Sequence, residues 1–174
     1  MSRFAAPFAL TAATALLLTA CGGGGNSVSV SAPHTTGAVA RQCAALQKAL
    51  PETLMGLSRR DTSPSSQNTA AWGDPAVTWR CGTGLPGVMD PHSKDYTPFS
   101  DNVTGQAAGG VCWASIYNQS DKSFTFASVD QQAIVQLSIP ADYTGKQSPL
   151  SVLAPAVAKT SPLDPDRKFQ CTDG

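Results

Sequence analysis

The chain has 174 residues, and its 12 basic and 12 acidic side chains give a formal net charge of zero. The basic residues are scattered along the chain and offer no continuous patch to neutralise phosphates, so nucleic-acid binding is disfavoured on electrostatic grounds. The length is that of one domain preceded by a short N-terminal segment.

The N-terminal segment has the layout of a secretory signal. Residues 4–20 carry no charge, are rich in Ala and Leu, and follow Arg3 and the free amine. The run is too short for a transmembrane helix, which needs about 20 apolar residues, and four glycines follow almost at once. A conventional secretory signal with a free Cys21 is the other alternative.

The segment ends in Leu18-Thr19-Ala20-Cys21, which resembles a bacterial lipobox. In such signals a diacylglyceryl group is attached to the cysteine, and a peptidase then cuts just before it. The resemblance implies that residues 1–20 are removed and that Cys21 becomes a lipidated N-terminus. The protein is then expected on the extracytoplasmic face of the cell membrane, held by two acyl chains that each contribute about 0.8 kcal/mol per buried CH₂.

Residues 21–37 are predicted to be a flexible tether, because they are rich in Gly and Ser and show neither periodicity nor charge. His34 lies in this segment and is not expected to take part in catalysis. The folded domain is expected to span residues 38–174.

A first helix is predicted over residues 37–50. Its apolar side chains recur at i, i+4, i+7 and i+11 and therefore share one face: Val39, Cys43, Leu46 and Leu50. A strand is predicted over residues 76–82, where alternation puts Cys81 on the core face with Val77 and Trp79. If this helix packs on this strand, the two core-facing cysteines are natural partners.

The middle of the chain is less regular. Residues 54–61 are ambiguous between strand and loop, residues 62–69 are predicted to be a polar turn, and residues 82–110 a long surface excursion rich in Gly and Pro. Three strands with short polar links then predict an antiparallel meander: residues 111–117, 123–129 and 133–139.

A second helix is predicted over residues 148–159, with Ser148 as N-cap, Pro149 at its first position and a kink at Pro155. The expected fold is therefore a single α+β domain, in which an antiparallel sheet of four to five strands packs against an N-terminal and a C-terminal helix. The tail from Thr160 is rich in Pro and Asp, and its Cys171 indicates that the tail is fastened back to the domain.

Apart from Cys21, the chain holds four cysteines that are about thirty residues or more apart: Cys43, Cys81, Cys112 and Cys171. Zinc sites need close pairs such as Cys-x₂-Cys, so we expect structural disulfides and no metal site. Four cysteines allow three connectivities, and spacing alone leaves these open.

Few residues of the predicted domain are candidates for chemistry. His92 is its single histidine and lies in a polar loop beside Ser93 and Asp95, where neighbours rarely reach catalytic geometry. No Gly-x-Ser-x-Gly elbow is present, so we expect no catalytic residue and no cofactor.

The segment Trp72-Gly73-Asp74-Pro75 has two interpretations. In the first, Trp72 packs at a sheet edge and Gly-Asp-Pro forms the turn into the next strand. In the second, Trp72, Asp74 and Arg80 form part of a recognition surface.

Three segments together resemble a family of actinobacterial secreted and lipid-anchored proteins known as domain of unknown function DUF3515: residues 43–54 (CAALQKALPETL), residues 69–77 (TAAWGDPAV) with Arg80-Cys81-Gly82, and residues 153–157 (LAPAV). The family pattern includes cysteines at Cys43 and Cys81, in agreement with their pairing. It more often has an acidic residue at Cys112, which implies that Cys112 and Cys171 form a second pair. The resemblance implies no activity.

These observations predict a membrane-anchored extracytoplasmic lipoprotein whose domain is non-catalytic and binds a cell-envelope protein or component. An alternative is a small-molecule or lipid-binding lipoprotein with a pocket between helix and sheet, and a cavity lined by Trp79, Phe124 and Leu137 would favour it. A hydrolase is the third hypothesis, which a cleft joining His92 to Ser or Asp side chains would favour.

Overall fold

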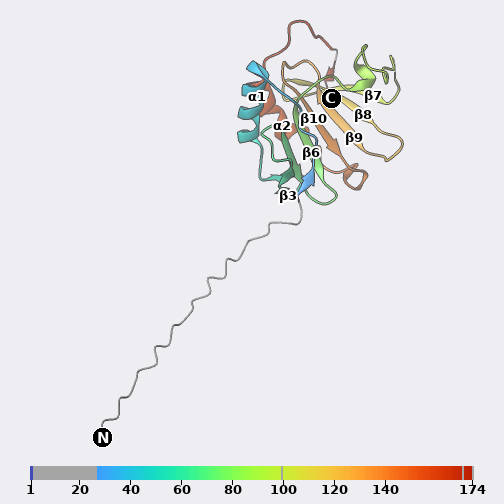
Figure 1. Cartoon of the computed structure of the whole chain (residues 1–174). Helices are drawn as coiled ribbons and strands as arrows, with labels where there is room; N and C mark the ends of the chain where they lie inside the picture. Colours follow the sequence, from blue (N-terminus) through green and yellow to red (C-terminus); the bar gives the residue numbers. More distant parts are fainter. Residues whose placement is uncertain (2–26, 99, 170, 174) are drawn as a thin grey trace.

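The computed structural model describes Met1 and residues 27–98, 100–169 and 171–173. The predicted signal peptide and the predicted lipidation site Cys21 lie outside the described residues. The described part folds as an α+β structure with two α-helices, α1 (Gly37–Ala49) and α2 (Leu150–Thr160), two short 3₁₀ turns, η1 (Gly87–Met89) and η2 (Ala141–Tyr143), and a large twisted sheet (Figure 1).

In the described residues the main sheet has nine strands in the order β11-β7-β8-β9-β10-β6-β5-β3-β2. All neighbouring pairs are antiparallel except β11 and β7. The strands are β2 (Thr53–Leu54), β3 (Leu57–Arg60), β5 (Thr69–Trp72), β6 (Val77–Thr83), β7 (Val103–Ala108), β8 (Val111–Tyr117), β9 (Phe124–Ser128), β10 (Ile134–Ile139) and β11 (Thr172–Asp173).

The predicted α+β class and the meander β8-β9-β10 are confirmed, but the predicted number of four to five strands is wrong. Strand β7 lies within the segment that was expected to be irregular, and β5 lies between the predicted turn and the predicted strand. Strand β5 shows no alternation because all four of its residues are buried, so neither face presents polar side chains to water.

The two helices lie side by side on one face of the sheet (Figure 1). They cover the main core, whose largest fully buried side chains include Trp72, Trp79 and Trp113. The indole Nε1 of Trp72 donates a hydrogen bond to the carbonyl oxygen of Pro51 at 2.9 Å, which links β5 to the end of α1. Helix α2 continues through Pro155, whose ring is exposed to solvent.

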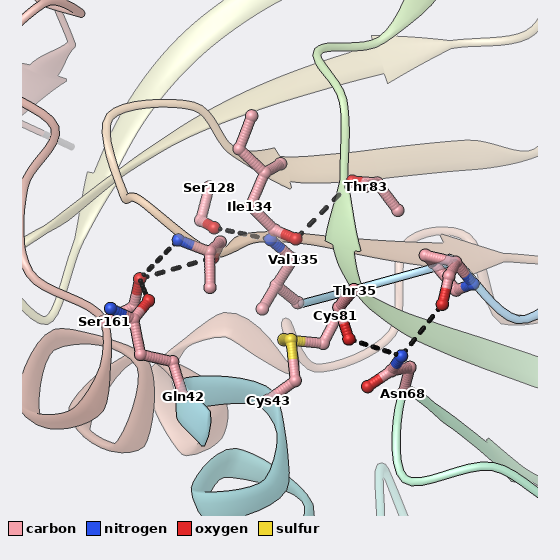
Figure 2. Close-up of a disulfide and its surroundings, with 12 residues drawn as sticks. Thr35, Gln42, Cys43, Asn68, Cys81, Thr83, Ser128, Ile134, Val135 and Ser161 are labelled. Atoms are coloured by element: carbon pink, nitrogen blue, oxygen red, sulfur yellow. Dashed lines mark hydrogen bonds between the residues drawn. A yellow bond between two sulfur atoms is a disulfide. The ribbon is translucent and has the colours of Figure 1, made fainter. Parts of the chain in front are cut away.

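A disulfide between Cys43 and Cys81 joins α1 to β6 at the centre of this core (Figure 2). Both cysteines are fully buried, and their Cα atoms are 5.5 Å apart. The pairing expected from the helical and strand faces is confirmed. Next to it, Gly82 adopts φ +77°, and a Cβ there would lie 2.2 Å from the side chain of Thr35, so this close approach requires glycine.

The chain before α1 is part of the folded domain from residue 28 on. Strand β1 (Val28–Ser29) pairs in parallel with β4 (Thr62–Ser63) in a separate two-stranded sheet. The buried Asn68 side chain donates hydrogen bonds to Pro33 O at 2.8 Å and Thr35 Oγ1 at 2.9 Å (Figure 2). The prediction of a flexible tether through residue 37 is therefore wrong for residues 28–36, and α1 is not the first element.

The C-terminal tail crosses the other face of the sheet. A disulfide joins Cys112 to Cys171, as the resemblance to the family pattern implied. Cys112 lies on the face opposite Trp113, and this face carries its own apolar cluster, against which Phe169 packs. The tail is thus a packed segment rather than a loose one held by a single bridge.

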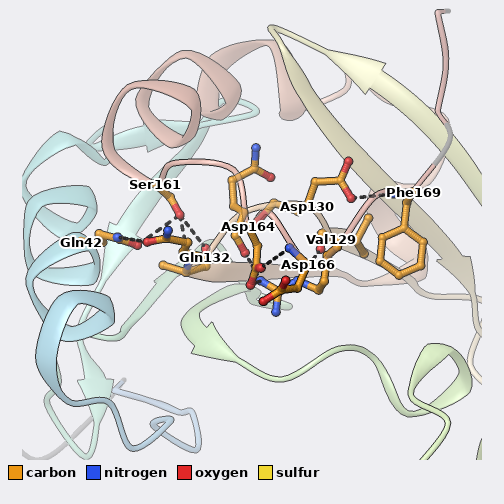
Figure 3. A network of polar contacts seen from close by, with 12 residues as sticks. Gln42, Val129, Asp130, Gln132, Ser161, Asp164, Asp166 and Phe169 are labelled. Atoms are coloured by element: carbon orange, nitrogen blue, oxygen red, sulfur yellow. Dashed lines mark hydrogen bonds and ion pairs between the residues drawn. The ribbon is translucent and has the colours of Figure 1, made fainter.

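Polar contacts fix the tail to the turn between β9 and β10 (Figure 3). The guanidinium of Arg167 donates hydrogen bonds to the carbonyl oxygens of Val129 and Gln131 and lies 3.0 Å from the Asp164 carboxylate. The backbone N–H of Phe169 donates to Asp130 Oδ1 at 2.9 Å. Because Gln131 is buried, these bonds satisfy carbonyl groups that water does not reach easily.

Candidate functional site

An open groove of about 780 Å³ lies on the sheet face away from the helices. Side chains alternate between the two faces of a strand, so the neighbours of the buried core residues form its floor. Register places Arg80 of β6 opposite Gln136 of β10, and aligns Thr125 of β9 with Ile116 of β8 and Val103 of β7. These five side chains all line the groove.

A charged side chain, Arg80, lies at one end of the groove. The half-buried Arg80 donates from Nη2 to Gln136 Oε1 at 2.7 Å, and Gln136 Nε2 donates to Gly84 O at 3.2 Å. This chain of bonds fixes the guanidinium above the floor. No carboxylate among the described residues forms an ion pair with Arg80, and its remaining N–H groups find no acceptor there.

The opposite end is a cluster of carboxamide and hydroxyl groups. Gln119 Nε2 donates to Asn102 Oδ1 at 3.0 Å, and Ser120 Oγ donates to Asn118 Oδ1 at 2.8 Å. The backbone N–H of Tyr117 donates to Asn102 O at 2.9 Å, which ties this cluster to the end of β8. These bonds link the turn at residues 118–120 to Asn102 across the end of the groove.

The groove has one charged residue in its described lining, and it is basic, in a protein whose formal net charge is zero. Arg80 is the charged residue among the described residues that line it, and the other lining residues are polar without charge or apolar. Two carboxylates, Asp101 and Asp121, adjoin lining residues in sequence but are themselves outside the lining. Asp121 accepts a hydrogen bond from the backbone N–H of Ser123 within its own turn. Hydrogen bonds from the side chain and the backbone of Ser123 lower the pKa of Asp121 and keep it ionised there.

The predicted recognition surface of Trp72, Asp74 and Arg80 is wrong in the case of Trp72. This side chain is fully buried and faces the helices, because it pairs with Val77 across the hairpin. Arg80 points to the opposite face, so the two cannot contact one ligand. Asp74 is exposed in the turn that follows β5 and lies 3.6 Å from Arg60.

The first interpretation of this segment is correct about the turn, since Gly73 to Pro75 connect β5 to β6. It is wrong about the edge, because β5 is an inner strand. Of the three residues, the structure leaves Arg80 in the groove. The sequence pattern did not single out its partner Gln136, which alternation along β10 places on the face opposite the core residues Val135 and Leu137.

A second hollow tests the hypothesis of a pocket between helix and sheet. It is apolar, measures about 210 Å³ and lies beside the start of α2, with Phe124, Phe126 and Tyr143 in its wall. Trp79 and Leu137, which were expected to line such a cavity, are fully buried in the core instead. The hollow is below the size range of about 300–1,000 Å³ of typical ligand pockets, whereas the groove lies within it.

His92 lies in the exposed loop after η1, and its backbone N–H donates to Asp90 Oδ1 at 2.9 Å. In the described part of the chain, no three His, Cys, Asp or Glu side chains gather in a way that could hold a metal ion. Within those same residues, neither helix is long and apolar enough to span a bilayer.

The fold and the groove define a small, disulfide-bonded α+β domain with a polar hollow on the sheet face opposite the helices. The chain belongs to a family of proteins of unknown function, DUF3515, whose model matches residues 5–165. No curated protein and no solved structure gives a significant match.

Proposed function

We propose that the protein is a membrane-tethered, extracytoplasmic lipoprotein whose domain binds a component of the cell envelope and has no catalytic activity. The observation that supports a binding role is the groove of about 780 Å³, in which side-chain hydrogen bonds link lining residues at both ends. Preformed, concave and partly apolar sites of this size are typical of ligand binding. The two disulfides agree with an oxidising compartment outside the cytoplasm.

The proposal of a lipid anchor depends on the sequence before the domain. Leu18-Thr19-Ala20-Cys21 supplies the lipobox-like signal, and the first paired residue of the domain, Val28, follows it closely. A domain anchored in this way meets envelope components at the membrane surface.

The binding of a small apolar molecule is a second candidate function. The hollow of about 210 Å³ supports it, because Met55, Phe124 and Ile139 give it an apolar lining. Such a ligand would be much smaller than the occupant of the groove.

Site-specific photocrosslinking in intact cells tests the primary proposal. A photoreactive residue replaces Thr97, which is exposed on the groove wall, and in a matched variant it replaces Ser151, which is exposed on α2. We expect adducts from position 97 that disappear when Arg80→Gln is added, and none from position 151. Equal adducts from both positions, or adducts insensitive to Arg80→Gln, would contradict binding in the groove.

A further inference from the structure

The groove combines a single fixed cation with many short hydroxyl and carboxamide side chains. We propose that its occupant is a saccharide segment that carries an acidic group, either carboxylate or phosphate, and that this group pairs with Arg80. The inference rests on the proposed binding function and names the chemical class of the ligand.

Arg80 carries the charge part of the inference. Its guanidinium has five N–H donors, and one of them is used for Gln136. The planar donor fork suits a carboxylate or a phosphate, and charge-assisted bonds of this kind are stronger than neutral ones. No described acidic residue lines the groove, so an anionic group at Arg80 would not compete with a carboxylate of the lining.

The uncharged residues that line the groove support the saccharide part of the proposal. Each sugar hydroxyl both donates and accepts hydrogen bonds, as do the hydroxyls of Thr125 and Ser100 and the carboxamides of Asn102 and Gln119. Ile116 and Val103 are adjacent across β8 and β7 and give the floor an apolar strip. A pyranose ring has the same division, with C–H groups on its faces and hydroxyls around its edge.

An extended acidic peptide fits this surface less well. Peptides that dock on sheets bind to a strand edge, where the backbone finds free N–H and C=O groups. The floor of the groove is the face of β6, β10, β9 and β8, whose backbone groups are bonded to neighbouring strands. A peptide there would find no backbone partners, so it would lack the main-chain hydrogen bonds that give such complexes their affinity.

Isothermal titration of the full chain in detergent tests the inference with four probes. Tetragalacturonate carries carboxylates, pentamannosyl phosphate carries a phosphate, maltotetraose is a neutral saccharide, and tetraglutamate is acidic without sugar. We expect at least one acidic saccharide to bind about tenfold or more tightly than maltotetraose, with tetraglutamate not binding. The stronger of the two acidic saccharides identifies carboxylate or phosphate as the preferred group.

Variants separate the charge from the sugar contacts. Arg80→Gln should weaken the acidic saccharide about tenfold, or about 1.4 kcal/mol, and leave maltotetraose unchanged. Lys48→Gln, which removes a charge from the exposed side of α1, should change neither. If Arg80→Gln does not fold, Gln119→Ala at the other end should weaken both saccharides.

Three results would overturn the inference: no binding of any saccharide, binding of tetraglutamate as tight as that of the acidic saccharides, or an Arg80→Gln variant with unchanged affinity. The inference and the broader proposal can fail separately. Crosslinking from position 97 that depends on Arg80, together with no saccharide binding, would retain a binding groove and reject this ligand class.

Discussion

The two disulfides should differ in their contribution to stability, although the loops that they close predict nearly equal effects. The bridges span 38 and 59 residues, for which chain entropy gives about 3.9 and about 4.2 kcal/mol. We compare two double variants that leave no unpaired thiol, Cys43→Ala/Cys81→Ala and Cys112→Ala/Cys171→Ala. Entropy alone makes the second variant slightly less stable than the first.

Burial reverses this order. Cys43 and Cys81 are fully buried between α1 and β6, so each replacement also leaves a cavity that costs about 1 kcal/mol. Cys112 and Cys171 are half-buried, and the tail can detach from the sheet while the main core stays folded, which limits the loss. We expect about 6 kcal/mol for the first variant and less than about 4 kcal/mol for the second.

Urea unfolding followed by tryptophan fluorescence measures both losses, because Trp72, Trp79 and Trp113 are buried in the main core. Cleavage of the tail by protease in the second variant, with a folded core remaining, would confirm local detachment. Equal losses in the two variants, or a larger loss in the second, would show that the tail is an integral part of the core and that our assignment of the two faces is wrong.

Three further substitutions have definite expected outcomes. Cys21→Ala should release the protein from membranes or leave an uncleaved precursor, and unchanged fractionation of a mature-sized form would refute lipidation. Gly82→Ala should cost more than about 2 kcal/mol in urea unfolding because of its positive φ and lack of space, whereas Gly84→Ala, which faces open space, should cost much less. Arg167→Ala should lower the free energy of unfolding by about 1–3 kcal/mol, because it leaves the carbonyl oxygens of Val129 and Gln131 unpaired. The control Lys168→Ala removes an exposed charge and should change it by no more than about 0.5 kcal/mol, and equal losses would contradict the role of Arg167.

The periodicity of apolar residues predicted the elements in which one face is buried more completely than the other. The helix α1 and the strand β6 each bury one side, and this placed Cys43 and Cys81 on facing surfaces. The meander β8-β9-β10 also alternates, although its second face holds buried residues of its own, such as Ala114 and Ala127. The pairing followed from these faces because a helix that covers a sheet brings their core-facing residues together.

The missed elements lack that contrast. Strand β5 is covered on both sides: Trp72 faces α1, and Thr69 Oγ1 lies 3.0 Å from Thr62 Oγ1 of β4. Strand β7, with the sequence VTGQAA, is half-exposed next to the sheet edge and has few β-forming residues. Strand β1 is two residues long and is set by its pairing with β4, which local sequence does not encode.

The candidate site was predictable in part. Alternation gave the outward direction of Arg80, but the groove also needs walls from residues 83–102 and 117–120, which are far apart in sequence. Trp72 was misassigned because a tryptophan beside a turn is compatible with either the surface or the core. The position of β5 inside the sheet decides for the core, and that position depends on long-range strand pairing.

The pairing of β1 with β4 sets how far the domain can move from its proposed anchor. With Val28 fixed to the fold, the seven residues from Cys21 to Ser27 separate the lipid from the domain. A fully extended chain of that length covers about 25 Å, less than the thickness of the hydrocarbon core of a bilayer. An anchored domain would therefore sample a thin layer next to the membrane, and it would reach only those envelope molecules that enter this layer.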